Sequence, residues 1–170
     1  ITSTSLETPL FNNLQYQKFV KISRDASIAA IASSNVPTII RILDPINLIV
    51  KYEIETNNEV RDLDISPDGK SLVYITAQTI EVISIVTGRS LQRRTDFNDS
   101  LLDKIKFMNN STVVLAMSLN SGGVQINTIS LKNKLKTIKD KLVDKKSKNI
   151  TSLDVNEKNG VIAFATNEDT

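Results

Sequence analysis

Residues 62–75, with the sequence DLDISPDGKSLVYI, decide the fold class. The first four positions alternate between polar and apolar residues, which is the period of a half-buried β-strand. After a turn at Pro67-Asp68-Gly69, the mostly apolar residues Ser71–Ile75 form a second strand. Asp-Gly supplies the positive φ that tight hairpins require. The stretch is therefore predicted to be a β-hairpin.

The pattern of this hairpin recurs along the chain. Its first strand, Asp62–Ser66, has three counterparts at Phe19–Ser23, Lys104–Met108 and Ser152–Asn156. The equivalent apolar residues are separated by 43, 42 and 48 residues, and they are Ile22, Ile65, Phe107 and Val155. These intervals lie at or just above the period of about 40–45 residues of four-stranded propeller blades.

Each period contains further predicted strands. The second strands are Ser27–Ala32, Ser71–Ile75, Thr112–Ala116 and Val161–Ala165; the third are Thr38–Leu43, Thr79–Ile85 and Val124–Ser130; the fourth are Leu48–Ile54, Ser90–Thr95 and Lys134–Leu142. Second strands are apolar on both faces, as expected where blades pack on either side. Fourth strands are more polar, and we expect Lys51, Glu53, Gln92 and Lys136 to face water. A β-sandwich with accidental spacing is the alternative.

The composition supports an all-β chain and excludes several classes of site. Of 170 residues, 49 are Ile, Val or Thr, which pack well on a pleated surface. There is no Cys and no His, so disulfides, thiolate zinc sites and Ser-His-Asp triads are excluded and a hydrolase is disfavoured. The formal net charge of +2 gives no reason to expect nucleic acid as a partner. Ile1–Ser5 has no features of a signal peptide, and the missing initial Met suggests a piece of a longer protein.

Two short motifs resemble WD repeats. Ser66–Lys70 resembles the turn between their first two strands, and Val86–Gly88 resembles the turn before their last strand. The Trp-Asp and Gly-His pairs of that family are absent, so the resemblance is to a divergent branch.

A longer resemblance, densest from Phe19 to Phe97, is carried by IAAIASSNVP at 28–37, RILDP at 41–45 and VYIT at 73–76. These residues resemble the cytosolic propeller of the yeast endoplasmic-reticulum proteins that activate the COPII small GTPase. That family comprises a guanine-nucleotide exchange factor and a close paralogue.

The resemblance implies an all-β fold, a β-propeller of divergent WD-repeat type. The chain would cover about three and a half blades of a ring of about seven. The implied parts are a last strand of a preceding blade at 1–14, blades at 19–56, 60–97 and 103–143, and the first half of a further blade at 150–170. The remaining blades of the same polypeptide are then expected to hold this part.

The resemblance also implies function. We expect a regulator of the COPII GTPase at the cytosolic face of the endoplasmic-reticulum membrane, with coat subunits as further partners and a transmembrane helix outside this chain. Such a regulator acts by protein contact and not as an enzyme. The family's exchange loop and its potassium ion also lie outside, so no catalytic, cofactor-binding or metal residue is carried over. The differing stretch PINLIV at 45–50 favours the paralogue. A scaffold propeller that binds a coat or peptide partner is the alternative.

Four local features are weighed as sites. Lys132–Lys148 holds eight Lys and two Asp, and we favour a solvated outer strand over a lipid-binding patch. Asp62 and Asp64 are expected to be structural, as acids that bind a turn, and not an acid–base pair. Solvent-exposed roles are favoured for Arg93-Arg94 and for the loop Ser33–Pro37. The glycosylation sequons at Asn98, Asn109, Asn110 and Asn149 are attributed to chance.

Overall fold

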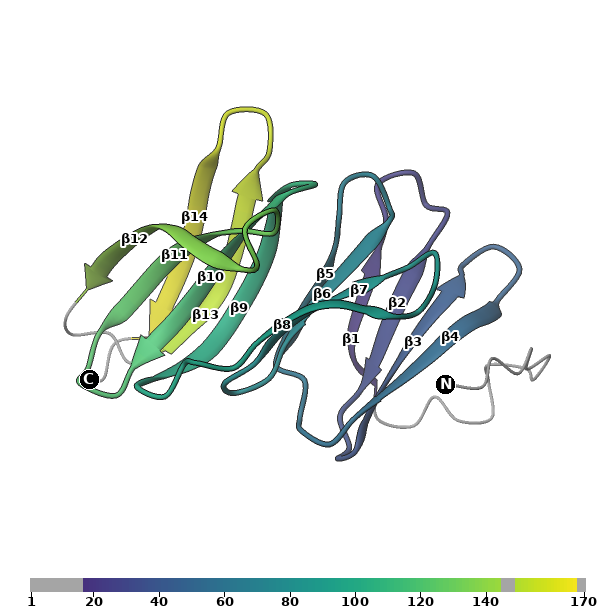
Figure 1. Ribbon diagram of the computed structural model, residues 1–170, viewed down its shortest axis with the longest axis horizontal. Helices are drawn as coiled ribbons and strands as arrows, with labels where there is room; N and C mark the ends of the chain where they lie inside the picture. The colour runs from purple at the N-terminus through teal and green to yellow at the C-terminus, as the bar shows by residue number, and fades with distance from the viewer. Residues whose placement is uncertain (1–16, 145–148, 168–170) are drawn as a thin grey trace.

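The computed structural model describes residues 17–144 and 149–167, so the strand predicted within residues 1–14 lies outside the described residues. The described residues form fourteen β-strands in four antiparallel sheets that follow one another along the chain (Figure 1). The all-β prediction is confirmed. In this part of the chain, no helix is long and apolar enough to cross a membrane.

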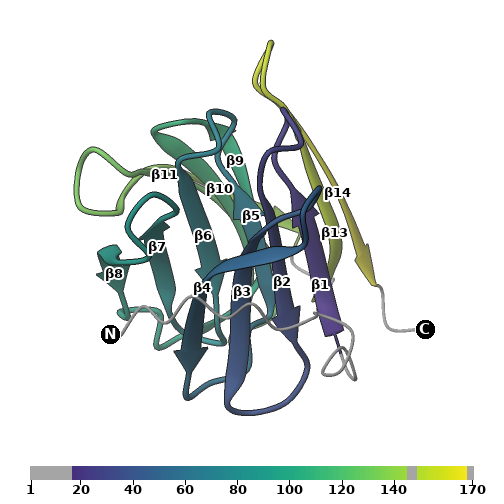
Figure 2. The ribbon, with the colours of Figure 1, turned by 90° about the vertical axis from the view of Figure 1, so that its right-hand side faces the viewer.

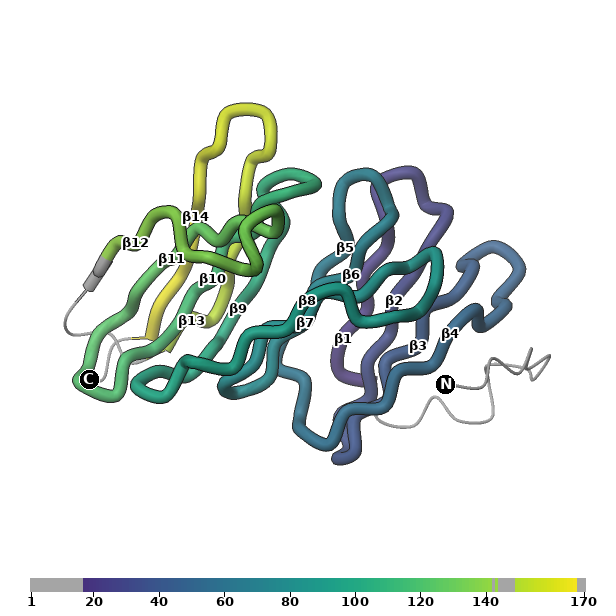
Figure 3. The backbone as a smooth tube through the Cα atoms, in the orientation of Figure 1, coloured from purple at the N-terminus to yellow at the C-terminus, as the bar shows by residue number. Residues whose placement is uncertain are grey.

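Three of the sheets have four strands each, and a fourth has two. The first sheet contains β1 (Gln17–Ile22), β2 (Ala29–Ser33), β3 (Thr38–Asp44) and β4 (Ile49–Thr56). The second contains β5 (Asp62–Ile65), β6 (Ser71–Ile75), β7 (Ile80–Ser84) and β8 (Ser90–Arg94). The third contains β9 (Ser100–Asn109), β10 (Thr112–Leu119), β11 (Val124–Ser130) and β12 (Lys136–Asp144). The last contains β13 (Asn149–Asn156) and β14 (Val161–Asn167). Within each sheet, neighbouring strands are neighbours in sequence, as the tube in Figure 3 makes easy to follow.

The repeat predicted from sequence is present in the strand register. Ile22, Ile65, Phe107 and Val155 pair with equivalent residues of the second strands, which are Ala29, Leu72, Val113 and Ile162. The residue before each of them forms a second equivalent row across its sheet. These rows are Lys21–Ala30–Ile42–Tyr52, Asp64–Val73–Val82–Gln92, Lys106–Val114–Thr128–Lys139 and Asp154–Ala163.

The first two hairpins are closed by the same side-chain contacts. Asp68 accepts hydrogen bonds from Ser66 Oγ at 2.7 Å and from the Lys70 amide at 3.1 Å. Asp25 accepts from Ser23 Oγ at 2.7 Å and from the Ser27 amide at 3.1 Å. These hydrogen bonds stabilise the carboxylate and lower the pKa of Asp25 to about 2.

Next to this turn, β2 is shorter than expected at its start. Ser27 and Ile28 were predicted to lie in the strand, but β2 begins at Ala29. The Ile28 amide donates to Ser23 Oγ at 3.0 Å, and the Ser27 amide donates to Asp25. Both amides are therefore used to close the turn.

The core lies between successive sheets, which stand face to face in Figure 1 and are seen from one end in Figure 2. Alternate residues of β6 point to opposite sides: Leu72 and Tyr74 pack with the first sheet, whereas Val73 and Ile75 pack with the third. Each second strand of a middle sheet is thus buried on both faces, as its apolar sequence predicts.

A β-bulge lies at one position in all three four-stranded sheets. The pairing of the third strand with the fourth shifts after Ile42, after Val82 and after Thr128, which are equivalent residues. The shift sets which side chains of the fourth strand face the next sheet.

The prediction that Gln92 faces water is wrong. Gln92 is half-buried, and its Nε2 donates a hydrogen bond to the Leu131 carbonyl of the third sheet at 2.6 Å. Tyr52, at the equivalent position of the first sheet, donates from its hydroxyl to the Val86 carbonyl of the second sheet at 2.7 Å. Lys51, Glu53 and Lys136 are exposed as predicted.

One ion pair joins sheets that are not neighbours. Arg24 Nη2, in the turn after β1, lies 2.8 Å from Glu157 Oε2, in the turn after β13. The first and last sheets therefore approach each other at the end where these hairpin turns lie (Figure 2).

Candidate interaction face

The first strands of the four sheets lie in a row, with contacts between β1 and β5, β5 and β9, and β9 and β13. Equivalent positions on these strands carry Lys21, Asp64, Lys106 and Asp154, so the sign of the charge alternates from sheet to sheet. Each of these charges lies next to at least one charge of opposite sign. The attraction between them favours this order of the sheets over an order that brings like charges together.

Asp62 and Asp64 join the second sheet to the third. Asp62 Oδ2 accepts a hydrogen bond from the Ile105 amide at 3.0 Å, and Asp64 Oδ2 accepts one from the Phe107 amide at 2.8 Å. The structural role expected for them is therefore present, but the acids bind strand amides of the next sheet and not a turn, because both side chains project from β5 toward β9.

Burial and neighbouring charges set the protonation of this row. Burial raises the pKa of both Asp62 and Asp64. Burial, followed by the charge of Lys106, lowers the pKa of Lys21. Burial alone would lower the pKa of Lys106, but the carboxylate of Asp64, whose Oδ1 lies 3.8 Å from Lys106 Nζ, contributes to a net rise. Lys21, Asp64 and Lys106 thus form a mixed-charge network in which burial and neighbouring charges act together.

A polar hollow of about 440 Å³ lies where the first strands begin. We call this end of the sheets the linker rim; it includes Lys18, Glu59, Arg61, Asp103, Lys104 and Asn149. Two ion pairs line it: Lys18 Nζ to Glu59 Oε1 at 2.6 Å, and Arg61 Nη2 to Asp103 Oδ1 at 2.9 Å. The buried Asp103 also accepts a hydrogen bond from Ser118 Oγ.

The loop Ser33–Pro37 lies at the same end of the first sheet, because β2 ends where β1 begins. Val36 is exposed at its tip, and the Ser33 hydroxyl accepts a hydrogen bond from the Ile39 amide at 3.0 Å. Its inner side is thus fixed by the backbone of β3, and its outer side is available to a partner.

The predicted solvent role of Arg93-Arg94 is correct for Arg93 only. The Arg94 Nη1 donates to the Leu135 carbonyl and to Thr137 Oγ1, both at 3.0 Å, and the guanidinium lies 4.5 Å from the centre of the Phe97 ring. Arg94 therefore links the second sheet to the third, because it pairs with Ile80, whose side chain packs in the cluster between these two sheets.

The basic segment lies on the outside of the third sheet. Lys132 and Lys134 are exposed in the turn after β11, and Lys136, Lys139 and Lys141 are exposed on β12. Residues 145–148 lie outside the described residues. The described lysines are exposed in this turn and on this outer strand, as the favoured interpretation expects.

The four sequon asparagines are exposed. Two of them have structural contacts: Asn109 Oδ1 accepts from the Ser111 amide at 2.9 Å, and Asn110 Oδ1 accepts from the Asp68 amide of the second sheet at 3.1 Å. In the described ranges, no three acidic side chains gather in a way that could hold a metal ion.

The sequence analysis missed Arg61–Asp103 as a pair. The two residues are 42 positions apart and occupy equivalent places, three residues before Asp64 and Lys106. One repeat period separates them, so alignment of the repeats was the available signal.

The chain resembles three curated proteins over most of its length. It is 49% identical over 156 residues to "Putative guanine nucleotide-exchange factor SED4" of Candida glabrata, a match that covers 90% of this chain and 15% of that protein. It is 41% identical over 160 residues to guanine nucleotide-exchange factor SEC12 of Candida glabrata, covering 92% of this chain and 35% of that protein. It is 43% identical over 156 residues to SED4 of Saccharomyces cerevisiae, covering 90% and 15%. The chain thus spans between 15 and 35% of the length of these relatives.

Solved structures show the same fold. The chain superposes on the C-terminal WD40 domain of Sif2 with a TM-score of 0.72 at 12% identity, covering 88% of this chain and 40% of that one. It superposes on hydrazine synthase of Kuenenia stuttgartiensis with a TM-score of 0.74 at 14% identity, covering 88% and 43%. No family model matches the chain. The predicted propeller class is confirmed; the number of blades and their boundaries stay predictions.

Proposed function

We propose that this chain, a homologue of the SEC12 and SED4 proteins, is part of a regulator of the small GTPase that initiates COPII vesicle formation at the endoplasmic reticulum. The observation that carries the proposal is 41–49% identity over at least 90% of the chain. The COPII role, the cytosolic face of the membrane and the coat subunits come from the resemblance described under Sequence analysis.

The mechanism is differential binding. An exchange factor shifts the GTPase toward its nucleotide-free state by binding that state more tightly, and no covalent bond is made or broken. Sheets packed through shared clusters form a rigid support, which suits a surface that must hold one state of a partner.

The linker rim is the surface we assign to the partner. It combines a polar hollow, charges of both signs and the exposed tip of the loop Ser33–Pro37. Polar rims of this kind set the specificity and association rate of a complex more than its affinity.

The activity is tested by release of labelled GDP from the COPII GTPase, with and without the complete cytosolic domain that contains this chain. Acceleration supports the exchange-factor form of the proposal. Binding without acceleration supports a SED4-like regulator, the form favoured by the identity of 49% to SED4 against 41% to SEC12 of the same organism. If the domain neither binds the GTPase nor accelerates GDP release, the proposal is contradicted.

The surface is tested by the double substitution Lys18→Ala with Lys104→Ala, which removes two cations of the hollow. We expect GTPase affinity to fall about 3- to 30-fold, because exposed charge pairs contribute up to about 1 kcal/mol each. Lys51→Ala, on the exposed face of β4, is the matched control and should leave affinity unchanged. Equal affinities of the two variants would place the contact elsewhere.

A further inference from the structure

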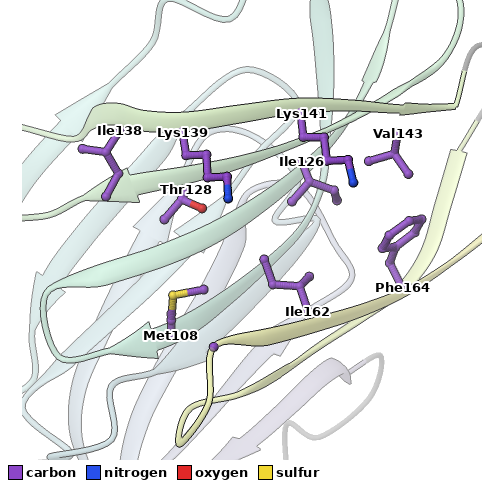
Figure 4. Close-up of a pocket in the computed structure, with 10 residues that line it drawn as sticks. Met108, Ile126, Thr128, Ile138, Lys139, Lys141, Val143, Ile162 and Phe164 are labelled. Atoms are coloured by element: carbon purple, nitrogen blue, oxygen red, sulfur yellow. The ribbon is translucent and has the colours of Figure 1, made fainter.

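Two hollows in the described part of the chain differ in how they hold their cations. A groove of about 630 Å³ lies between the third sheet and β14, and most of its lining is apolar. Figure 4 shows Lys139 and Lys141 above this groove, opposite Ile162 and Phe164. Both lysines are exposed, so water solvates their ammonium groups. The hollow at the linker rim, in contrast, is lined mainly by charged side chains, most of which are held in ion pairs.

The hollow at the linker rim contains more cations than acids. Its cations are Lys18, Arg61 and Lys104, and its acids are Glu59 and Asp103. Lys18 pairs with Glu59 at 2.6 Å, and Arg61 pairs with Asp103 at 2.9 Å. Each acid of the lining therefore already has a cation. One positive charge of the hollow has no counter-charge among the side chains that line it.

This positive charge belongs to Lys104. In the described ranges its Nζ takes part in no ion pair, whereas Lys106, two residues along the same strand, has Asp64 Oδ1 at 3.8 Å. Burial raises the pKa of Asp62, and the charge of Lys104 is among the smaller effects that lower it. The Asp62 carboxylate is bound instead to the Ile105 amide at 3.0 Å. Lys104 is half-buried, so an added anion would stabilise its charge more than it would at an open surface.

Arg61 supplies further donors to the same hollow. Its backbone is fixed, because its amide donates to the Ile75 carbonyl at 2.8 Å. Its side chain is fixed by Asp103, which binds Arg61 Nη2 through one carboxylate oxygen and accepts a hydrogen bond from Ser118 Oγ through the other. In the part of the chain that the structure describes, this contact uses one of the five N–H groups of a guanidinium. The other N–H groups are available to a ligand.

We propose that the hollow binds the carboxylate of one Asp or Glu side chain of the protein partner, with Lys104 Nζ and the Arg61 guanidinium as donors. The identity of this partner rests on the proposed function, which assigns the linker rim to the GTPase. A carboxylate carries a single negative charge, and it matches the single positive charge left over in the hollow. A phosphate group carries a charge of about −1.5 to −2 and would place further negative charge beside Glu59 and Asp103.

The site is tested first with a probe that needs no GTPase. The complete cytosolic domain that contains this chain is titrated with the peptide acetyl-Gly-Asp-Gly-amide, whose only charge is one carboxylate, at low and constant ionic strength. We expect the amide resonances of Arg61 and Lys104 to shift, with half of the full shift at about 1–10 mM peptide. The same peptide with Asn in place of Asp should bind at least about 5-fold more weakly. Equal binding of the two peptides, or tighter binding of inorganic phosphate, overturns the assignment of a carboxylate.

Substitutions of Lys104 test its role as a donor. Lys104→Met removes the charge but keeps an aliphatic side chain, and it should weaken peptide binding about 5- to 10-fold. Lys104→Arg keeps the charge and should bind within about 3-fold of the parent. Lys136→Met, at an exposed position of the same sheet, is the matched control and should leave binding unchanged. An unchanged Tm shows that each variant is folded. Equal binding by Lys104→Met and Lys136→Met overturns the role of Lys104.

The same variants are then compared for their affinity for the GTPase. Lys104→Met should lower this affinity about 5- to 10-fold, and Lys136→Met should not change it. If the parent binds the GTPase and both variants bind it equally well, the carboxylate site is overturned and the proposed function stands. If the parent does not bind the GTPase, the proposed function is contradicted, and the peptide titration still decides whether the hollow binds a carboxylate.

Discussion

At the scale of single residues, the same contact recurs at two junctions between sheets, but different residue types make it. Tyr52 and Gln92 both reach from a fourth strand to a carbonyl of the next sheet, although one is a phenol and the other an amide. A repeat search by residue identity cannot find such a pair. The register of the strands identifies it at once, because both residues stand at the end of equivalent rows.

Gly88→Ala tests the first of these junctions. A Cβ at Gly88, where φ is +66°, would lie 2.5 Å from Tyr52 Cδ1, so the ring must move and its bond to Val86 is lost. We expect a loss of about 2–4 kcal/mol of unfolding free energy. Gly160→Ala is the control, with φ at +68° and open space around it. It should cost only the backbone strain, about 1–2 kcal/mol, and denaturant unfolding measures both.

Asp25→Ala tests the hairpin turn by its pH dependence. The folded pKa of Asp25 is about 2, below its ordinary value of 3.8, so the carboxylate contributes stability above pH 4 that is lost as pH falls toward 2. The substituted protein should therefore have a lower Tm than the parent at pH 5, and the difference should shrink as pH approaches 2. A difference in Tm that does not change between these pH values would contradict the assignment.

At the scale of strands and hairpins, the sequence predicts where the fourth strands lie, but not which of their side chains contact the next sheet. Hairpins such as residues 62–75 are specified locally, by alternation on one side and an Asp-Gly turn in the middle. The bulges after Ile42, Val82 and Thr128 leave no local signal of this kind. The polarity of the fourth strands assigns Gln92 and Arg94 to solvent, and both assignments fail because these side chains bind carbonyls of the third sheet. The hollow at the linker rim was equally hidden, because its ion pairs join residues about one repeat apart.

The substitution Arg94→Met tests one such inter-sheet link. It removes two hydrogen bonds to β12 and the turn before it, together with the contact over Phe97. We expect a loss of about 1.5–3 kcal/mol in unfolding free energy, since the Leu135 carbonyl loses a charged donor. Arg93→Met, at an exposed neighbouring position, should change stability by less than about 0.5 kcal/mol. Equal effects in chemical denaturation would show that Arg94 is not an inter-sheet contact.

At the scale of the whole molecule, the sheets are coupled in series, because each middle sheet contributes to two clusters. Sheet order and the propeller class follow from the sequence repeat, whereas the charge alternation of Lys21, Asp64, Lys106 and Asp154 appears only when the sheets are placed side by side. The two lysines and two aspartates cancel in the net charge, so the composition gives no indication of their alternation.

Substitutions in β6 test this coupling. Leu72 and Ile75 are fully buried on opposite sides of the strand, so Leu72→Ala loosens the junction with the first sheet and Ile75→Ala the junction with the third. Each should cost about 2–5 kcal/mol. Amide exchange should rise in β2 and β3 for Leu72→Ala and in β9 and β10 for Ile75→Ala, and also within β6–β7 for both. A rise confined to β6 in either variant would mean that neighbouring sheets open independently.

The ion pair between Arg24 and Glu157 directly connects the first and the last sheet of the row. Its two residues lie in turns 133 residues apart, so small changes of tilt at the three junctions between sheets add up in the distance between these two turns. Both side chains are solvent-accessible and project from tight turns, which keeps their backbones fixed. Paired labels at these two positions would therefore act as a gauge of curvature, and a partner that flattens or tightens the row would lengthen or shorten the distance between them.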